Sequence, residues 1–270
     1  MVTIQSKQYI SMDTSDGREL RYVMRGEDWK RNDPFVILAD DRFAHNTFMD
    51  HPHKGIETVS YIVDGSLTHY DSKTGGGGRL HEGDFQLMTA ARGVIHNENP
   101  DRGEKVRVLQ LWNNLSAAHK KHEAGYQDVQ AKTVPTVQLD GAEIKVFSGE
   151  CFGVTGAVKN LTKFTYIIAT IEKGNTVSFP IIKGDNYFTY ILNGEVEVAD
   201  AVATANEFIR FGIAENEETL SFTAKEDTQL LFLGGTPLNE PFAARGPFVM
   251  NTEEELNEAF RDYRNGTFLD

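Results

Sequence analysis

The chain has 270 residues, enough for one large domain or two ordinary ones, and an apolar content of 40% supplies a core and excludes general disorder. Its 27 Lys and Arg residues against 40 Asp and Glu residues give a net charge of −13. Because nucleic acids and anionic membranes are bound mainly through basic residues, this charge argues against both as direct partners.

The single cysteine, Cys151, excludes an intramolecular disulfide and a thiolate metal cluster, and it suits a reducing compartment. The N-terminal segment up to Gly17 lacks the apolar run of a secretory signal. No apolar stretch approaches the roughly 18 residues that a membrane span needs. We therefore expect a cytoplasmic protein with no membrane partner.

Short runs of β-branched and aromatic residues, separated by Gly, Asp and Asn, recur along the chain and predict strands. In chain order they include Thr58–Val63, Val106–Trp112, Phe164–Ile171, Tyr187–Leu192 and Gln229–Leu233. Many short strands at this spacing are typical of an all-β sandwich or barrel.

An internal repeat divides these strands into two sets. Tyr61–Leu67 and Tyr190–Val196 share one pattern: an aromatic residue, two aliphatic residues, Asp or Asn, Gly, any residue, and an aliphatic residue. The offset from Tyr61 to Tyr190 is close to half the chain, which favours a duplicated fold. We place the boundary near Lys132–Pro135 and predict domains over residues 1–133 and 134–270.

One helix is predicted, at the end of the second domain. Thr252 and Glu255 form the T-x-x-E pattern of a capping box. An apolar stripe with helical spacing follows them, made of Leu256, Ala259, Phe260 and Tyr263. We expect this helix to pack on a barrel.

All eight histidines precede residue 123, so histidine chemistry belongs to the first domain. The second domain is expected to lack metal ligands and to fill its interior with apolar side chains, among them Phe179, Ile181, Tyr187 and Tyr190.

Two short clusters concentrate the histidines. His51 and His53 form an H-x-H pair, and His96 is followed by Glu98 at the same spacing. On a strand, residues i and i+2 point to one face. If the two strands lie opposite each other inside a barrel, three imidazoles and one carboxylate converge, as a mononuclear Fe(II), Mn, Ni, Cu or Zn site requires.

The remaining histidines are expected to be solvated or to lie in loops, and Trp112 is expected to belong to the core and not to the pocket. These histidines are His45, near the pocket mouth, His69, His81, His119 and His122.

Two glycine-containing motifs surround the histidine clusters. The first contains His51, His53, Glu57 and Gly65, and the second contains Gly83, Gly93 and His96. They match the two motifs of the cupin superfamily, the second in a stretched form. That stretched form, residues 83–98, resembles the pirin family of this superfamily, as do Leu109–Trp112, Pro237–Pro241 and Gly246–Thr252.

The resemblance implies two cupin (jelly-roll) barrels with a short C-terminal helix. It also implies one divalent metal per chain in the first barrel, with Fe(II) first among the candidates and Zn, Mn, Ni and Cu as alternatives. The implied ligands are His51, His53, His96 and Glu98. Glu57 is expected to orient a histidine N–H instead of binding the metal.

The resemblance further implies a metal-dependent dioxygenase of the quercetin 2,3-dioxygenase type. It would act on a small aromatic substrate such as a flavonol together with O₂, with Glu98 as ligand and base. The alternative is a non-catalytic, iron-binding transcriptional co-regulator or redox sensor that acts through a protein partner. A third, weaker option is an isomerase or another cupin reaction on a polar substrate.

Overall fold

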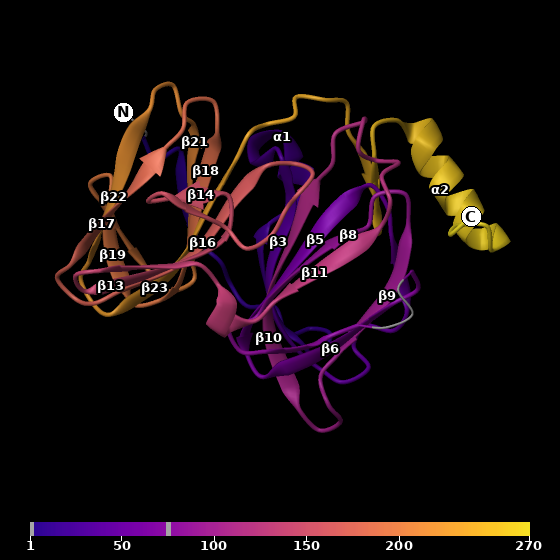
Figure 1. Cartoon of the computed structure of the whole chain (residues 1–270), viewed down its shortest axis with the longest axis horizontal. Helices are drawn as coiled ribbons and strands as arrows, with labels where there is room; N and C mark the ends of the chain where they lie inside the picture. The colour runs from indigo at the N-terminus through magenta and orange to yellow at the C-terminus, as the bar shows by residue number, and fades with distance from the viewer. Residues whose placement is uncertain (1–2, 74–76) are drawn as a thin grey trace. The chain divides into compact units, whose positions relative to one another are not determined.

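The computed structural model describes residues 3–73 and 77–270, which form two compact all-β units (Figure 1). We call them the first barrel, made of residues 12–131, 160–162 and 238–270, and the second barrel, made of residues 3–11, 132–159 and 163–237. Each pairs a large antiparallel sheet with a smaller one, so the predicted jelly-roll architecture is confirmed.

The first barrel has a six-stranded sheet in the order β11-β8-β5-β10-β3-β2 and a four-stranded sheet in the order β4-β9-β6-β7. In Figure 1, β3, β5, β8 and β11 lie in one layer, and β6 and β9 lie in the other. Its elements are β2 (Glu19–Met24), η1 (Gly26–Asp28), α1 (Trp29–Asn32), β3 (Phe35–Ala44), β4 (His51–His53), β5 (Ile56–Asp64), β6 (Ser66–Asp71), β7 (Arg79–His81), β8 (Phe85–Thr89), β9 (Val94–Asn99), β10 (Lys105–Asn114), β11 (Gly125–Val129), β24 (Ala243–Arg245), β25 (Phe248–Met250) and α2 (Glu253–Asn265).

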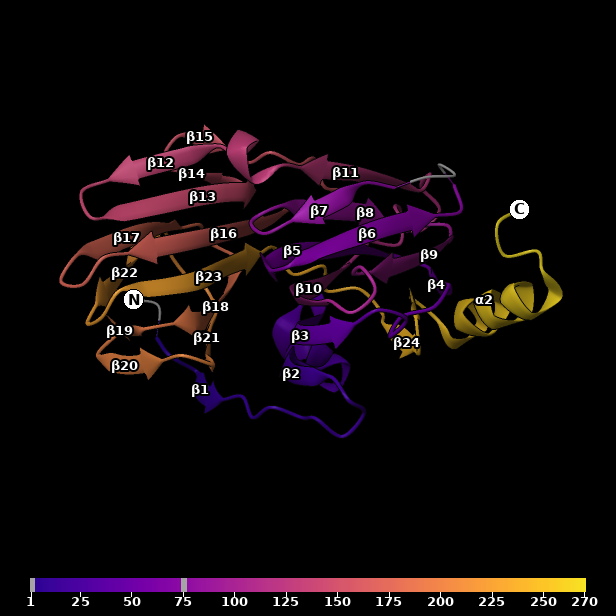
Figure 2. The same cartoon turned by 90° about the horizontal axis from the view of Figure 1, so that it is seen from below.

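The second barrel has a seven-stranded sheet in the order β1-β21-β18-β23-β16-β13-β12 and a four-stranded sheet in the order β17-β22-β19-β20. Figure 2 shows β12, β13, β16 and β23 side by side. Its strands are β1 (Ser6–Tyr9), β12 (Thr136–Leu139), β13 (Ala142–Ser148), β14 (Glu150–Cys151), β15 (Val154–Thr155), β16 (Phe164–Ile171), β17 (Thr176–Ile181), β18 (Asn186–Asn193), β19 (Glu195–Val198), β20 (Ala201–Thr204), β21 (Glu207–Ile213), β22 (Glu218–Ala224) and β23 (Thr228–Gly235); the turn η2 (Ala131–Thr133) spans the boundary between the units.

The five strands predicted from residue pattern are all present, as parts of β5, β10, β16, β18 and β23. The repeated motif forms the β5–β6 hairpin in the first barrel and the β18–β19 hairpin in the second. Gly65 and Gly194 turn these hairpins at φ of 87° and 80°, and a Cβ at either position would collide with a carbonyl oxygen. The repeat therefore marks the same corner of both barrels.

The predicted domain limits of 1–133 and 134–270 differ from the two units at both ends of the chain. β1 pairs with β21 in the second barrel, where Ser6 lies opposite Arg210. The segment from Leu238 to Asp270, which contains α2, belongs to the first barrel. Contacts between segments so far apart in the sequence leave no local pattern. The sequence therefore predicts neither the placement of β1 in the second barrel nor that of the C-terminal segment in the first.

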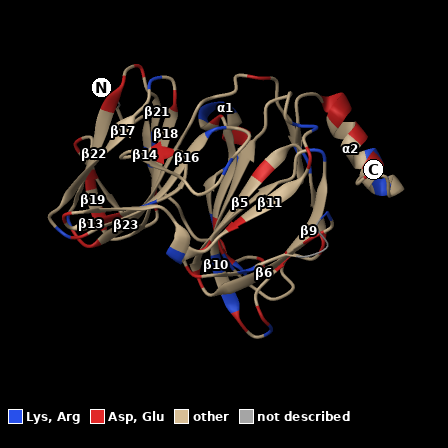
Figure 3. Ribbon diagram, in the orientation of Figure 1, with Lys and Arg blue, Asp and Glu red and all other residues tan. Residues whose placement is uncertain are grey.

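The predicted C-terminal helix is confirmed as α2. Thr252 and Glu255 make both hydrogen bonds of the capping box. Figure 3 shows acidic residues in the first turn and basic residues toward the end, which complements the helix dipole. Leu256 and Ala259 are buried against the β24–β25 hairpin, with Phe248 as their neighbour.

Lys120 ties this C-terminal segment into the first barrel. Its ammonium is buried and donates to the carbonyl oxygens of Gly55 and Val249 and to Asn114 Oδ1, at 2.7–2.9 Å. Burial lowers the pKa of Lys120 to about 7, against the opposing effect of the carboxylates of Glu240 and Glu255.

Phe179, Ile181 and Tyr187 belong to the apolar core of the second barrel, as predicted. Tyr190 is buried as well, but it lies outside that core cluster. Within residues 3–73 and 77–270, no helix has the length and hydropathy needed to cross a membrane.

Candidate metal centre

The pairing of β4 with β9 brings the two predicted histidine clusters together. The strands are antiparallel, and His51 lies directly opposite His96. β4 is an edge strand of its sheet, which is where a proline such as Pro52 is tolerated. The chain then turns at Gly55 (φ 83°), where a Cβ would collide with the Val249 carbonyl oxygen. Glycine therefore lets β25 approach the end of β4.

One ring nitrogen from each of His51, His53 and His96 lies within 4.8 Å of the other two, and among the described residues this is the one such group of three or more metal-binding side chains. His53 and His96 are buried, at 4% and 1% exposure, and His51 is half-buried. The structure thus brings together the three imidazoles that the strand pattern places on inward faces.

In each of the three imidazoles, Nδ1 makes a hydrogen-bond contact with a neighbouring group, which leaves Nε2 to bind a metal. Nδ1 of His51 lies 2.8 Å from the Met49 carbonyl oxygen, and Nδ1 of His53 lies 3.3 Å from that of Pro247. Nδ1 of His96 lies 3.1 Å from His69 Nε2, while His96 Nε2 is buried with no hydrogen-bond partner among the described residues. This is the donor arrangement of a histidine metal site.

The buried histidines are neutral at neutral pH. Burial, together with the neighbouring His51, lowers the pKa of His53 to about 3. Burial also lowers the pKa of His96 well below its ordinary value, with His53, His51 and His69 adding to the shift. Neutral imidazoles keep the lone pair that a metal requires, so the donor set fits a divalent ion.

Glu98 lies in the same pocket but outside the group of three imidazoles. Its carboxylate is buried, and Oε1 accepts a hydrogen bond from Ser60 Oγ at 2.7 Å. Ser60 Oγ also lies 3.0 Å from the Gln110 side-chain amide. The Gln110 atom at this distance is Oε1, and one hydroxyl proton serves one acceptor, so both contacts are satisfied once the amide is turned to donate its N–H. The chain Gln110–Ser60–Glu98 then fixes the carboxylate.

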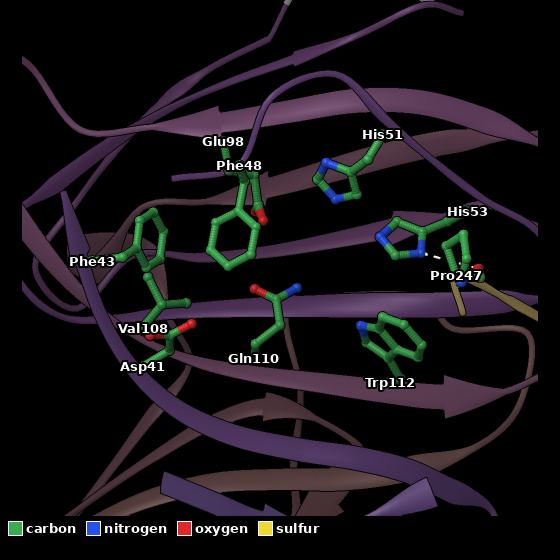
Figure 4. A pocket seen from close by; sticks show the side chains of 10 residues that line it. All are labelled: Asp41, Phe43, Phe48, His51, His53, Glu98, Val108, Gln110, Trp112 and Pro247. Atoms are coloured by element: carbon green, nitrogen blue, oxygen red, sulfur yellow. Dashed lines mark hydrogen bonds between the residues drawn. The ribbon is translucent and has the colours of Figure 1, made fainter. Parts of the chain in front are cut away.

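The pocket is a cavity of about 230 Å³ with histidines at one end and an acid at the other. Figure 4 shows His51, His53 and Trp112 at one end, Asp41 at the opposite end, and Gln110 between them. Phe43, Phe48 and Val108 complete its apolar walls. The indole of Trp112 stands edge-on to His53, with ring centres 4.9 Å apart. Trp112 packs against a core cluster of the first barrel, as predicted, but it also lines the pocket, so its predicted exclusion from the pocket is wrong.

His69 is the residue that sequence reasoning missed. It was expected to be exposed, but it is 1% exposed and contacts His96. The missed signal is the period-two pattern of β6, in which Leu67, His69 and Asp71 all point inward. The expectation that Glu57 orients a histidine is also wrong: its carboxylate accepts from Thr89 Oγ1, Asn113 Nδ2 and the Leu161 N–H.

The other expected positions hold: His81 and His122 are exposed, while His45 and His119 are partly exposed outside the strands.

Asp41 supplies a buried carboxylate at the far end of the pocket. Its Oδ2 pairs with Arg18 at 3.0 Å, whereas Oδ1 is buried with no hydrogen-bond partner among the described residues. Burial raises the pKa of Asp41 to about 6, against the opposing effect of Arg18. Asp41 is thus a hydrogen-bond acceptor for a ligand that reaches this end.

The raised pKa of Asp41 predicts how stability depends on pH. The folded state holds the proton up to about pH 6, and the unfolded chain loses it near pH 4, so the wild type loses stability as pH rises through this window. Asp41→Asn should gain stability relative to the wild type between pH 4 and pH 7, by up to about 3 kcal/mol. Urea unfolding at both pH values measures this; Asp64→Asn, on the surface, is the control. A difference independent of pH would contradict the prediction.

Comparisons with known proteins agree with the fold. The family model described as "Pirin" matches residues 16–113, and the model described as "Pirin C-terminal cupin domain" matches residues 166–269. The chain is 35% identical to pirin of Rattus norvegicus over 253 residues, covering 92% of this chain and 87% of that protein.

Two solved structures are similar along most of their length. One, a protein from Geobacillus kaustophilus, has 38% identity and a TM-score of 0.85, over 89% of this chain and all of the other. The other, a quercetin 2,3-dioxygenase from Acinetobacter baumannii, has 31% identity and a TM-score of 0.89, over 100% of this chain and 99% of the other. The chain therefore belongs to the pirin family, and its two jelly-roll barrels are cupin domains.

Proposed function

We propose that the first barrel binds one divalent metal through His51, His53, His96 and Glu98, and that the protein is a dioxygenase of the quercetin 2,3-dioxygenase type. The observation that carries this proposal is the group of three imidazoles at the end of an aromatic-walled cavity. The similarity of the whole chain to the quercetin 2,3-dioxygenase of Acinetobacter baumannii supports the reaction type. Fe(II) is the proposed metal, because a site of imidazole and carboxylate donors suits iron and O₂ chemistry.

The chain's own residues would bind and orient a planar substrate. Phe43, Phe48 and Trp112 offer apolar faces to aromatic rings. A cavity of about 230 Å³ encloses part of a flavonol, about one or two of its rings. Oδ1 of Asp41, which has no hydrogen-bond partner among the described residues, would accept a hydrogen bond from a ring hydroxyl at the far end.

Glu98 would act on the proton of the substrate. A bound divalent metal supplies Lewis acidity toward a substrate oxygen. The Glu98 carboxylate, fixed by Ser60, would then accept the proton of the substrate hydroxyl beside it. His51, His53 and His96 would hold their positions through the Nδ1 contacts described above.

Metal analysis tests the ligand set. Protein reconstituted anaerobically with Fe(II) should hold about one metal per chain, since one group of ligands is present in the described residues. His53→Ala should weaken metal binding by more than about 100-fold, beyond the 10–100-fold typical for losing a residue that only orients a ligand. His45→Ala is the matched control. Two metals per chain, or none after loading, would contradict the proposal.

His69 is expected to set the affinity through His96. Metal binding at His96 Nε2 needs the proton on Nδ1, which then donates to His69 Nε2. His69→Ala should raise the metal dissociation constant by about 10–100-fold, and His69→Gln should restore part of it through an acceptor oxygen. Competition with a chelator measures both variants, with the exposed His81→Ala as control. Equal affinity in all four proteins would remove His69 from the site.

Glu98→Gln separates catalysis from metal binding. The variant keeps the size and one neutral oxygen donor but loses the charge and the basicity. Metal binding should weaken without vanishing, and flavonol-dependent oxygen uptake at equal metal loading should fall by about 100-fold or more. The exposed Glu104→Gln is the control. Full activity in Glu98→Gln would exclude Glu98 as the base.

The alternative function is a non-catalytic, metal-binding regulator that acts through a protein partner. The net charge of −13 suits protein contacts better than nucleic-acid contacts. The same experiment decides between the two functions. A metal-loaded wild type with no oxygen uptake across a panel of flavonols would favour the regulator.

A further inference from the structure

The second barrel contains a cavity that the proposed metal chemistry does not use. Its volume is about 570 Å³, within the range of about 300–1,000 Å³ that is typical of small-molecule sites. Strands β16, β17, β18, β22 and β23 supply most of its walls, and the β14–β15 hairpin lies at its rim.

The cavity lies beside the β17–β22 pair, where Pro180 is opposite Thr219. Side chains alternate along β17: Phe179 and Ile181 are buried in the apolar core, whereas Ser178 and Pro180 are exposed and reach the cavity from the other face. No imidazole is among the described residues that line the cavity.

Equivalent strands of the two barrels, β10 and β23, carry different side chains at the position that lines the cavity. Tyr61 lies opposite Leu109 in the first barrel, and Tyr190 lies opposite Leu231 in the second. The next residue along each strand is Gln110 in the metal pocket and Phe232 in the second cavity. The amide of Gln110, which contacts Ser60, therefore has the aromatic ring of Phe232 as its counterpart.

The rim of the cavity carries exposed apolar side chains. Phe152 and Ile182 are 38% and 51% exposed, although each is large and apolar. Phe152 also has φ of 50°, in the left-handed region that bulky residues rarely adopt. Such strain persists where the surroundings fix it, and it clusters at ligand-binding positions. The β14–β15 turn therefore holds an aromatic ring at the cavity mouth.

The lining indicates an uncharged ligand. Phe152, Tyr187 and Phe232 present aromatic surface, and hydroxyl groups come from Thr165, Ser178 and Thr219. Among the described lining residues, Glu150 is the one charged side chain, and its carboxylate disfavours anions. The Tyr187 hydroxyl accepts from the Ile182 N–H at 2.9 Å, which leaves its own proton for a ligand oxygen.

We propose that this cavity binds an uncharged, hydroxylated aromatic molecule, with its rings among Phe152, Tyr187 and Phe232 and its oxygen at Tyr187 or the threonine hydroxyls. The site is independent of the metal centre and of the proposed dioxygenase activity.

Titration with 2-naphthol tests the site, followed by NMR of the isoleucine methyl groups. The Ile167 and Ile182 signals should shift with a dissociation constant below about 1 mM, as expected for a ligand of this size in contact with several aromatic rings. The isosteric anion 2-naphthoate should bind at least about tenfold more weakly, because of Glu150 and the net charge.

Two variants locate the binding. Ile182→Arg places a bulky cation at the mouth and should weaken 2-naphthol binding by about tenfold or more, whereas Ile213→Arg, similarly exposed in the same barrel but outside the cavity lining, should not. If Ile182→Arg fails to fold, Phe152→Ala replaces it with the same expectation. Unshifted Ile167 signals, or equal binding by the wild type and the mouth variant, would overturn the proposal.

Discussion

The antiparallel pairing of β4 with β9 is the constraint on which the candidate metal centre depends. It places His51 opposite His96 and leaves His53 and Glu98 on the same inward face. Because side chains alternate along a strand, a slip of one residue would turn Pro52 and Ile95 inward and the imidazoles outward. The close approach of β25 at Gly55 and the three hydrogen bonds of Lys120 hold the end of β4 in this register.

The alternation of side chains along a strand predicted much of this site, because the candidate ligands lie two residues apart on single strands. It made co-facial pairs of His51 with His53 and of His96 with Glu98, and the β4–β9 pairing supplies the condition under which the two pairs converge. The same alternation on β6 turns His69 inward, but the role of His69 depends on a neighbour 27 residues away on the adjacent strand. The role of Glu57 depends on Leu161, in a segment much further along the chain. Interactions fixed by tertiary pairing leave no spacing pattern in the sequence.

The predicted domain limits differ from the two units for the same reason. Tyr61–Leu67 and Tyr190–Val196 correctly mark equivalent hairpins, because Asp-Gly and Asn-Gly turns are local features. β1 and the segment after residue 237 are assigned by long-range contacts, so a boundary drawn between two halves of the chain cannot capture them.

The two barrels use one framework for different interiors. The first buries a polar chain, Gln110–Ser60–Glu98, together with neutral histidines, and these groups need partners to offset the cost of their burial. The second packs aromatic rings at the same level, with Phe179 stacked on Phe232 at 4.5 Å. Duplication of the fold leaves each interior free to specialise.

The contact between His53 and the Pro247 carbonyl oxygen has a consequence for the order of biosynthesis. The nascent chain leaves the ribosome with its N-terminus first, so β4, β9 and β10 emerge long before β25. Until residues 238–250 have emerged, His53 lacks the acceptor for its Nδ1 and Lys120 lacks the Val249 carbonyl oxygen. The first barrel to be synthesised is therefore the last to be completed, and a nascent chain passes through most of translation with its candidate metal centre unfinished.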